Sequence, residues 1–125
     1  MPITYDIDRS QDLTTFTLSD EVTFEDMMAV LALYGKEGPT IYELYDARTL
    51  AGKRLAFEEM NKLAGYLARF SEKRPSGSKT AIVVAKDVDF GLSRMIQILT
   101  ETTTIYDIQG FRDMDEARQW LAAEK

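Results

Sequence analysis

A run of five apolar residues, Ala81 to Ala85, has no polar position on either side of a strand. Five residues suit a strand better than a helix, and β-branched residues fill the centre of the run. Charged residues follow it, and apolar residues at helical spacing begin at Phe90. The stretch from Lys79 to Leu99 therefore predicts a strand, a loop and a helix, with the strand buried on both faces at the centre of a sheet.

Length and residue types limit the class of protein. The 125 residues suit one domain with one core, so we expect a single domain over residues 1–125. Because the chain has no cysteine and no histidine, thiol catalysis, a Ser-His-Asp triad and metal sites built on cysteine or histidine are excluded. No other group of residues indicates a reaction, so we expect no catalytic residue, no metal, no cofactor and no enzyme activity.

Charge and hydropathy limit the partners. The net charge is −6, which repels nucleic-acid phosphates and anionic lipid surfaces. No window approaches the roughly 18 uncharged apolar residues of a membrane span, and the first residues have neither a basic nor an apolar leader pattern. We therefore expect no nucleic-acid partner, no stable membrane insertion and a cytoplasmic location.

The pattern along the chain predicts a mixed sheet. Residues 3–8 and 13–19 alternate polar and apolar side chains, which is typical of a hairpin. The later segments alternate helix and strand, so their strands should be parallel: helices over 24–34, 55–73 and 90–102, strands over 40–47, 81–85 and 105–111, and a terminal helix. Thr23, Asp113 and either Asp87 or Asp89 are expected to cap helices. The prediction is an α/β fold with a sheet of about five strands and four helices.

Charged side chains follow the ends of the expected parallel strands. They are Asp46, Arg48, Lys86, Asp87 and Arg112. In open α/β sheets, ligands bind outside the carboxyl ends of the strands. We therefore take these residues as a candidate ligand or partner surface. The simpler alternative is that they cap helices and form ordinary surface ion pairs, such as Asp46 with Arg48.

The strand over 40–47 predicts a second surface. Ile41, Glu43 and Tyr45 share one of its faces, and the neighbouring positions share the other. A carboxylate at the centre of a covered strand is unfavourable, so we expect one face of the sheet to be partly open. If the helices cover the opposite face, Ile41, Glu43 and Tyr45 form a homodimer face with Tyr45 as its anchor.

Four methionines, at positions 27, 28, 60 and 95, fall at core spacing on the expected helices. Methionine fills gaps in cores, and its flexible side chain also lines pockets for apolar ligands. Core packing is the simpler interpretation, and a pocket is the alternative.

Four segments carry a family resemblance: Ile3–Asp8, Asp46–Arg48, Val83–Met95 and Phe111–Leu121. In these segments the chain resembles the STAS-like group related to the sporulation anti-anti-sigma factors, and in particular a bacterial branch described as STAS or Sec14-like. The resemblance covers nearly the whole chain. It implies a β/α superhelical domain with a mixed sheet and no known enzyme activity.

The two sides of this resemblance imply different functions. Regulatory STAS proteins are phosphorylated on a serine after the third strand, but residues 49–57 contain no serine, and Thr49 is only a distant substitute. The Sec14 side implies binding of a lipid or another apolar ligand, although the chain is too short for the helices that gate such pockets. We expect a non-enzymatic regulatory or protein-binding module, similar to an anti-sigma factor antagonist, that binds a protein or itself. The alternative is a domain that binds a small apolar ligand; a closed apolar cavity would favour it.

Overall fold

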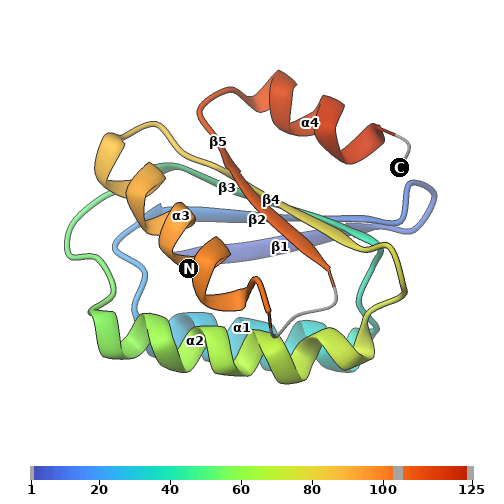
Figure 1. The fold of residues 1–125 in the computed structure, drawn as a ribbon, viewed down its shortest axis with the longest axis horizontal. Helices are drawn as coiled ribbons and strands as arrows, with labels where there is room; N and C mark the ends of the chain where they lie inside the picture. The colour runs from blue at the N-terminus through green and yellow to red at the C-terminus, as the bar shows by residue number, and fades with distance from the viewer. Residues whose placement is uncertain (1, 103–105, 124–125) are drawn as a thin grey trace.

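A five-stranded mixed sheet lies at the middle of the part of the chain that the computed structural model describes, residues 2–102 and 106–123 (Figure 1). In chain order the elements are β1 (Ile3–Asp8), β2 (Leu13–Asp20), α1 (Phe24–Glu37), β3 (Tyr42–Leu50), α2 (Phe57–Phe70), the 3₁₀ helix η1 (Ser71–Lys73), β4 (Lys79–Val83), α3 (Asp87–Thr100), β5 (Asp107–Phe111) and α4 (Met114–Ala122). The strand order is β1-β2-β3-β4-β5. The hairpin of β1 and β2 is antiparallel, and the other neighbours are parallel. The predicted α/β fold, with five strands and four helices, is confirmed for these residues.

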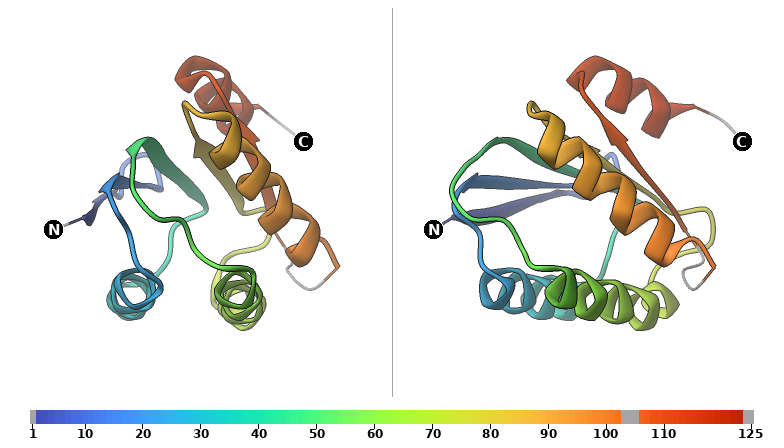
Figure 2. Two further views of the ribbon diagram at one scale, coloured as in Figure 1. Left: turned by 90° about the vertical axis from the view of Figure 1, so that its left-hand side faces the viewer. Right: turned by 60° about the vertical axis from the view of Figure 1, so that its left-hand side comes forward.

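The two faces of the sheet are covered unequally. Helices α1, α2 and α3 cover one face, while α4 lies on the other, over β3, β4 and β5 (Figures 1 and 2). Strand β4 begins and ends two residues before the predicted range of 81–85. Ala81 and Val83 are fully buried against α4 on one face, and on the other face Thr80 is buried and Ile82 is half-buried. The place of β4 in the sheet differs from the prediction, because β3 is the middle strand and β4 lies beside it.

A lysine of β4 holds α4 in place. The Lys79 ammonium donates hydrogen bonds to the carbonyl oxygens of Trp120 and Ala123 at 2.8 and 3.0 Å, and it lies 5.1 Å from the centre of the Trp120 ring. The last carbonyls of a helix have no partner within the helix, and a cation there is favourable. The short α4 is therefore fixed at its carboxyl end by a charge from the sheet.

The helix starts were predicted with mixed success. At the start of α1, the side chains and backbone N–H groups of Thr23 and Asp26 form a reciprocal capping box. Asp113 caps α4 by accepting from the Asp115 N–H. The predicted cap of α3 is wrong, because the residue before its first turn is Lys86, which makes no side-chain capping bond. The predicted last strand began at residue 105, which lies outside the described residues.

The burial of β4 leads to a stability prediction. Val83→Asp places a carboxylate where the parent side chain is fully buried, and we expect a loss of about 3 to 7 kcal/mol in the free energy of unfolding. The control is Val88→Asp, because Val88 is 54% exposed in the first turn of α3, where a negative charge is tolerated or favourable. Urea unfolding of both variants measures the difference. Equal losses would contradict the placement of β4.

Candidate functional site

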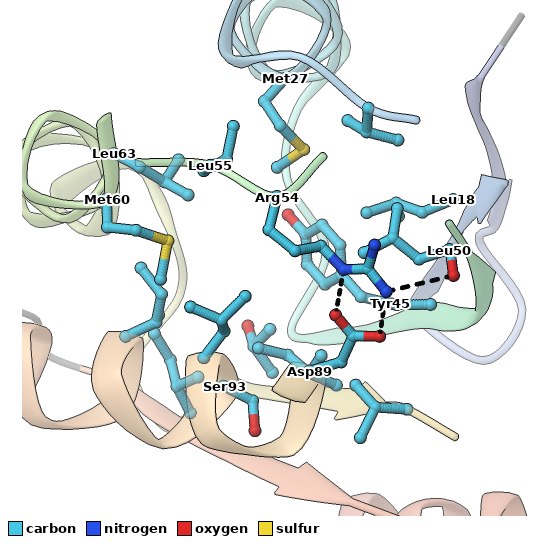
Figure 3. A pocket seen from close by; sticks show the side chains of 18 of the residues that line it. Leu18, Met27, Tyr45, Leu50, Arg54, Leu55, Met60, Leu63, Asp89 and Ser93 are labelled. Carbon is cyan, nitrogen blue, oxygen red and sulfur yellow. Dashed lines mark hydrogen bonds and ion pairs between the residues drawn. The ribbon is translucent and has the colours of Figure 1, made fainter. Parts of the chain in front are cut away.

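A cavity of about 150 Å³ lies between the sheet and helices α1, α2 and α3 (Figure 3). Most of the side chains that line it are apolar: Leu18, Val22, Met27, Tyr45, Ala47, Leu50, Leu55, Met60, Leu63, Leu67, Ile82, Val84, Leu92, Ile96, Tyr106 and Ile108. The polar and charged ones are Glu43, Lys53, Arg54, Thr80, Asp89 and Ser93. An apolar cavity of this volume accommodates a molecule of about the size of benzene.

Helices α1 and α2 supply one side of the cavity. Helix α2 lies between α1 and α3, and its apolar stripe, which includes Met60, Leu63 and Leu67, lines the cavity. Met27 of α1 lines the same cavity. Both interpretations of the methionines apply here, because Met27 and Met60 are buried in the core and also line the cavity.

An ion pair joins two elements at the end of the cavity where β3 finishes. The Arg54 guanidinium, in the loop between β3 and α2, donates to both carboxylate oxygens of Asp89 on α3, at 2.5 and 3.0 Å (Figure 3). It also donates to the carbonyl oxygens of Gly52 and Leu50. The hydrogen bonds to Asp89 raise the pKa of Arg54. Asp89 is 4% exposed and lies in the first turn of α3, so the ion pair is largely shielded from solvent.

A second ion pair lies toward the opposite end, where β3 and β4 begin. The Arg74 Nη1 is 3.3 Å from the Glu43 Oε1, and both side chains are almost completely buried. The Thr80 hydroxyl, opposite Glu43 in the register of β3 and β4, accepts from Arg74 at 2.7 Å and donates to the same Glu43 Oε1 at 2.9 Å. The ion pair and the Thr80 hydroxyl lie at the cavity wall, which includes Glu43, Thr80 and Tyr106.

Arg74 has further partners around its guanidinium. It donates to the carbonyl oxygens of Thr40, Ile41 and Lys79. The Tyr106 ring lies 4.1 Å from the guanidinium carbon, at a distance typical of a cation–π contact. These groups supply the hydrogen bonds that a fully buried guanidinium needs.

The second carboxyl oxygen of Glu43 makes none of these contacts. Within the described part of the chain, Oε2 is buried and has no hydrogen-bond partner. Burial raises the pKa of Glu43, and the positive charge of Arg74 opposes that rise. Burial and the nearby Glu43 charge also raise the pKa of Tyr34 to about 12. The inner end of the cavity is thus a polar spot in an apolar wall.

The predicted surface at the carboxyl ends of the strands divides into two ion pairs and a loop contact. Asp46 pairs with Arg48 at 2.9 Å, and hydrogen bonds from Arg48 lower the pKa of Asp46. Arg112 pairs with Asp87 at 2.6 Å, and both side chains are largely exposed. Lys86 donates to the Leu50 carbonyl. The geometry agrees with the simpler alternative of ordinary surface pairs, and a ligand or partner role for these residues stays a prediction.

The predicted dimer face requires a correction. Glu43 and Tyr45 are 2% and 8% exposed, and Ile41 is half-buried. The expectation that these side chains lie on an open face is wrong because α1, α2 and α3 cover that side of β3, while α4 covers the side of Leu44. Glu43 is accommodated by Arg74 and not by water. A homodimer formed through some other surface stays a prediction.

Sequence reasoning missed both arginines of the cavity. Arg54 and Arg74 lie in loops beside helix ends, where a basic residue is unremarkable. The signal for Arg74 was available at Glu43, because a carboxylate in the middle of a covered strand needs a buried cation. No sequence spacing identifies that cation.

The strand order has one antiparallel edge strand, and three helices cover one face of the sheet while one covers the other. These features define a small mixed α/β domain with a partly open cavity between the sheet and the three helices. The SpoIIAA-like family model matches residues 13–122. The chain belongs to the SpoIIAA-like family, as the STAS-like resemblance in its sequence suggested.

Solved structures support this fold. One is an uncharacterised protein from Shewanella loihica PV-4, described as having a SpoIIAA-like fold. It is 24% identical, with a TM-score of 0.61, and the match covers 96% of this chain and 94% of that chain. Among curated proteins, none matches the sequence significantly. In the described residues, no helix has the length and apolar character needed to cross a membrane.

The buried carboxyl group leads to a pH prediction. Because the pKa of Glu43 is raised in the folded state, its contribution to stability is full below the ordinary value of 4.5 and is lost as pH rises through the raised value. Glu43→Gln removes this titration. We expect the stability of the parent relative to Glu43→Gln to decrease as the pH rises above 4.5 and through the raised pKa, as measured by urea unfolding at several pH values. An increase in relative stability with pH would mean that the positive charge of Arg74 lowers the pKa of Glu43 more than burial raises it.

Proposed function

We propose that this SpoIIAA-like protein is a non-enzymatic binding protein that holds a small, mostly apolar molecule in its interior cavity. The observation that carries the proposal is the cavity of about 150 Å³ with predominantly apolar walls. The Sec14 side of the sequence resemblance implies the same class of ligand.

The apolar lining of the cavity supports a ligand. The cavity is partly open to solvent, so without a ligand its apolar walls are exposed to water, and an apolar occupant would remove that surface from water with a gain of roughly 25 cal/mol per Å². An apolar occupant restores the contacts that are missing across the gap. Met27 and Met60 give the wall flexible side chains that adapt to the shape of an occupant.

The charged groups at the cavity support binding without catalysis. Asp89 accepts from Arg54 through both oxygens. Glu43 pairs with Arg74 through Oε1, and its Oε2 has no partner among the described residues but is buried. A general acid or base needs a proton site within reach of a substrate, and this arrangement favours a structural role for both carboxyl groups.

A protein contact is the second candidate function. Phe57 and Val88 are 60% and 54% exposed, and they lie in the first turns of α2 and α3. The ion pair of Arg54 with Asp89 joins the segment before α2 to the first turn of α3. Exposed large apolar side chains favour a partner surface, including one for a second copy of the chain.

Benzene titration tests the cavity. We expect the melting temperature of the parent to rise with benzene concentration, because a ligand that binds the native state stabilises it. Ile82→Trp, which adds an indole to the cavity wall, should abolish this rise. The control is Ile98→Trp on α3, where the side chain is 62% exposed, and here the rise should persist. The same response in both variants would place benzene elsewhere and contradict the proposal.

Sedimentation equilibrium tests the second candidate. We expect association above the 14.2 kDa mass of one chain at micromolar concentration, and the double variant Phe57→Ser, Val88→Ser should return the protein to a single chain. Leu33→Ser is the control, because Leu33 is 57% exposed on α1, away from these turns. Association that survives the double variant would exclude this surface as the dimer contact.

A further inference from the structure

The side chains that line the cavity differ in their exposure to solvent. Most of them are buried, and those that are not are Leu50, Lys53, Arg54, Leu55, Ile82 and Leu92. Ile82 lies on β4, whereas the others belong to residues 50–55 and to the second turn of α3. This distribution indicates that the cavity opens between α3 and residues 50–55, which we call the entrance segment.

The entrance segment is held mainly by side chains. Among the described residues, the backbone N–H groups of residues 52–55 make no hydrogen bond to another backbone group. Arg54 joins the segment to Asp89 of α3, and Lys86, directly before α3, donates to the Leu50 carbonyl. A segment with so few backbone hydrogen bonds opens at a lower free energy than a helix or a central strand does.

The ion pair of Arg54 with Asp89 connects the two sides of this opening (Figure 3). Asp89 lies on α3 three residues before Leu92, and both members of the pair line the cavity. Both carboxylate oxygens accept from the guanidinium, at 2.5 and 3.0 Å, which is a strong form of such a pair. The side chains are only 16% and 3% exposed, so salt screens the pair weakly. The opening can widen here only if the pair separates.

The ion pair at the other end of the cavity has a different position in the fold. Arg74 donates to the carbonyl oxygens of Thr40, Ile41 and Lys79, which lie at the starts of β3 and β4. Its guanidinium therefore ties neighbouring strands of the sheet to one another, whereas Arg54 ties a loop to a helix. Of the two pairs, only that of Arg54 joins elements that can separate without breaking the sheet.

We propose that the entrance segment is the gate of the cavity and that the ion pair of Arg54 with Asp89 holds it closed. Separation of the pair then sets the rate at which a ligand enters and leaves. This inference rests on the proposed function and adds how access to the same cavity is controlled. In this arrangement, Arg54 and Asp89 are positioning residues, and the apolar walls hold the ligand.

Benzene exchange followed by NMR tests the gate. A gate changes the rates of entry and release by the same factor and leaves the dissociation constant unchanged, because it acts on the path between the free and bound states. Asp89→Asn keeps the shape of the side chain and removes its charge. We expect both rate constants to increase about tenfold, because a charge-assisted hydrogen bond becomes a neutral one. The methyl line shapes of Leu63 and Leu67, which line the cavity, give the rates and the dissociation constant.

Asp87→Asn is the matched control. Asp87 lies in the same turn of α3 and also pairs with an arginine, Arg112, but it is exposed and lies outside the described lining of the cavity. This variant should keep the exchange rates of the parent. A pair with only a structural role would lower the stability to urea and leave the exchange rates unchanged. Parent rates in Asp89→Asn, or equal acceleration in both variants, would overturn the gate.

A measurement on the free parent protein is decisive if Asp89→Asn does not fold. In relaxation dispersion, the amides of residues 51–55 and of Asp89 should share one exchange process on the microsecond to millisecond timescale. Trp120, on the other face of the sheet, should not take part. No exchange in the entrance segment, or exchange confined to the residues around Arg74, would overturn this inference, and benzene binding would leave the proposed function standing. No binding of benzene to the parent would overturn both.

Discussion

The buried pair of Arg74 and Glu43 is the interaction on which the rest of the structure depends. The guanidinium donates to carbonyl oxygens at the starts of both β3 and β4, and to the hydroxyl of Thr80. It therefore joins the two middle strands at one end, through groups that would otherwise be buried without partners. Such a pair contributes little net stability compared with apolar residues, but removing one partner costs about 3 to 5 kcal/mol. The chain thus depends on keeping both members.

The same pair sets the polar part of the cavity wall. Glu43 and Thr80, which are opposite in the register of β3 and β4, both line the cavity. On the other face of the sheet, α4 packs directly on Leu44, Ala81 and Val83.

The sequence predicted the fold well and the site poorly, for physical reasons. Alternation and helical spacing are local signals, so the hairpin, the helices and the apolar strand at Ala81 were predictable. The position of Glu43 was noted as unusual, but its explanation was wrong. A carboxylate in a strand is compatible both with an open face and with a buried cation, and the choice depends on Arg74, which is 31 residues away in the sequence. Only the folded chain brings the two together.

The two ends of the cavity differ in how each carboxyl group is engaged. At the end near the carboxyl terminus of β3, Asp89 accepts from Arg54 through both of its oxygens. At the inner end, Glu43 Oε1 interacts with Arg74 and Thr80, while Oε2 is buried without a hydrogen-bond partner among the described residues. Apolar walls separate the two pairs. Because the charged groups are held by each other, the surface that the cavity offers to an occupant is mostly apolar.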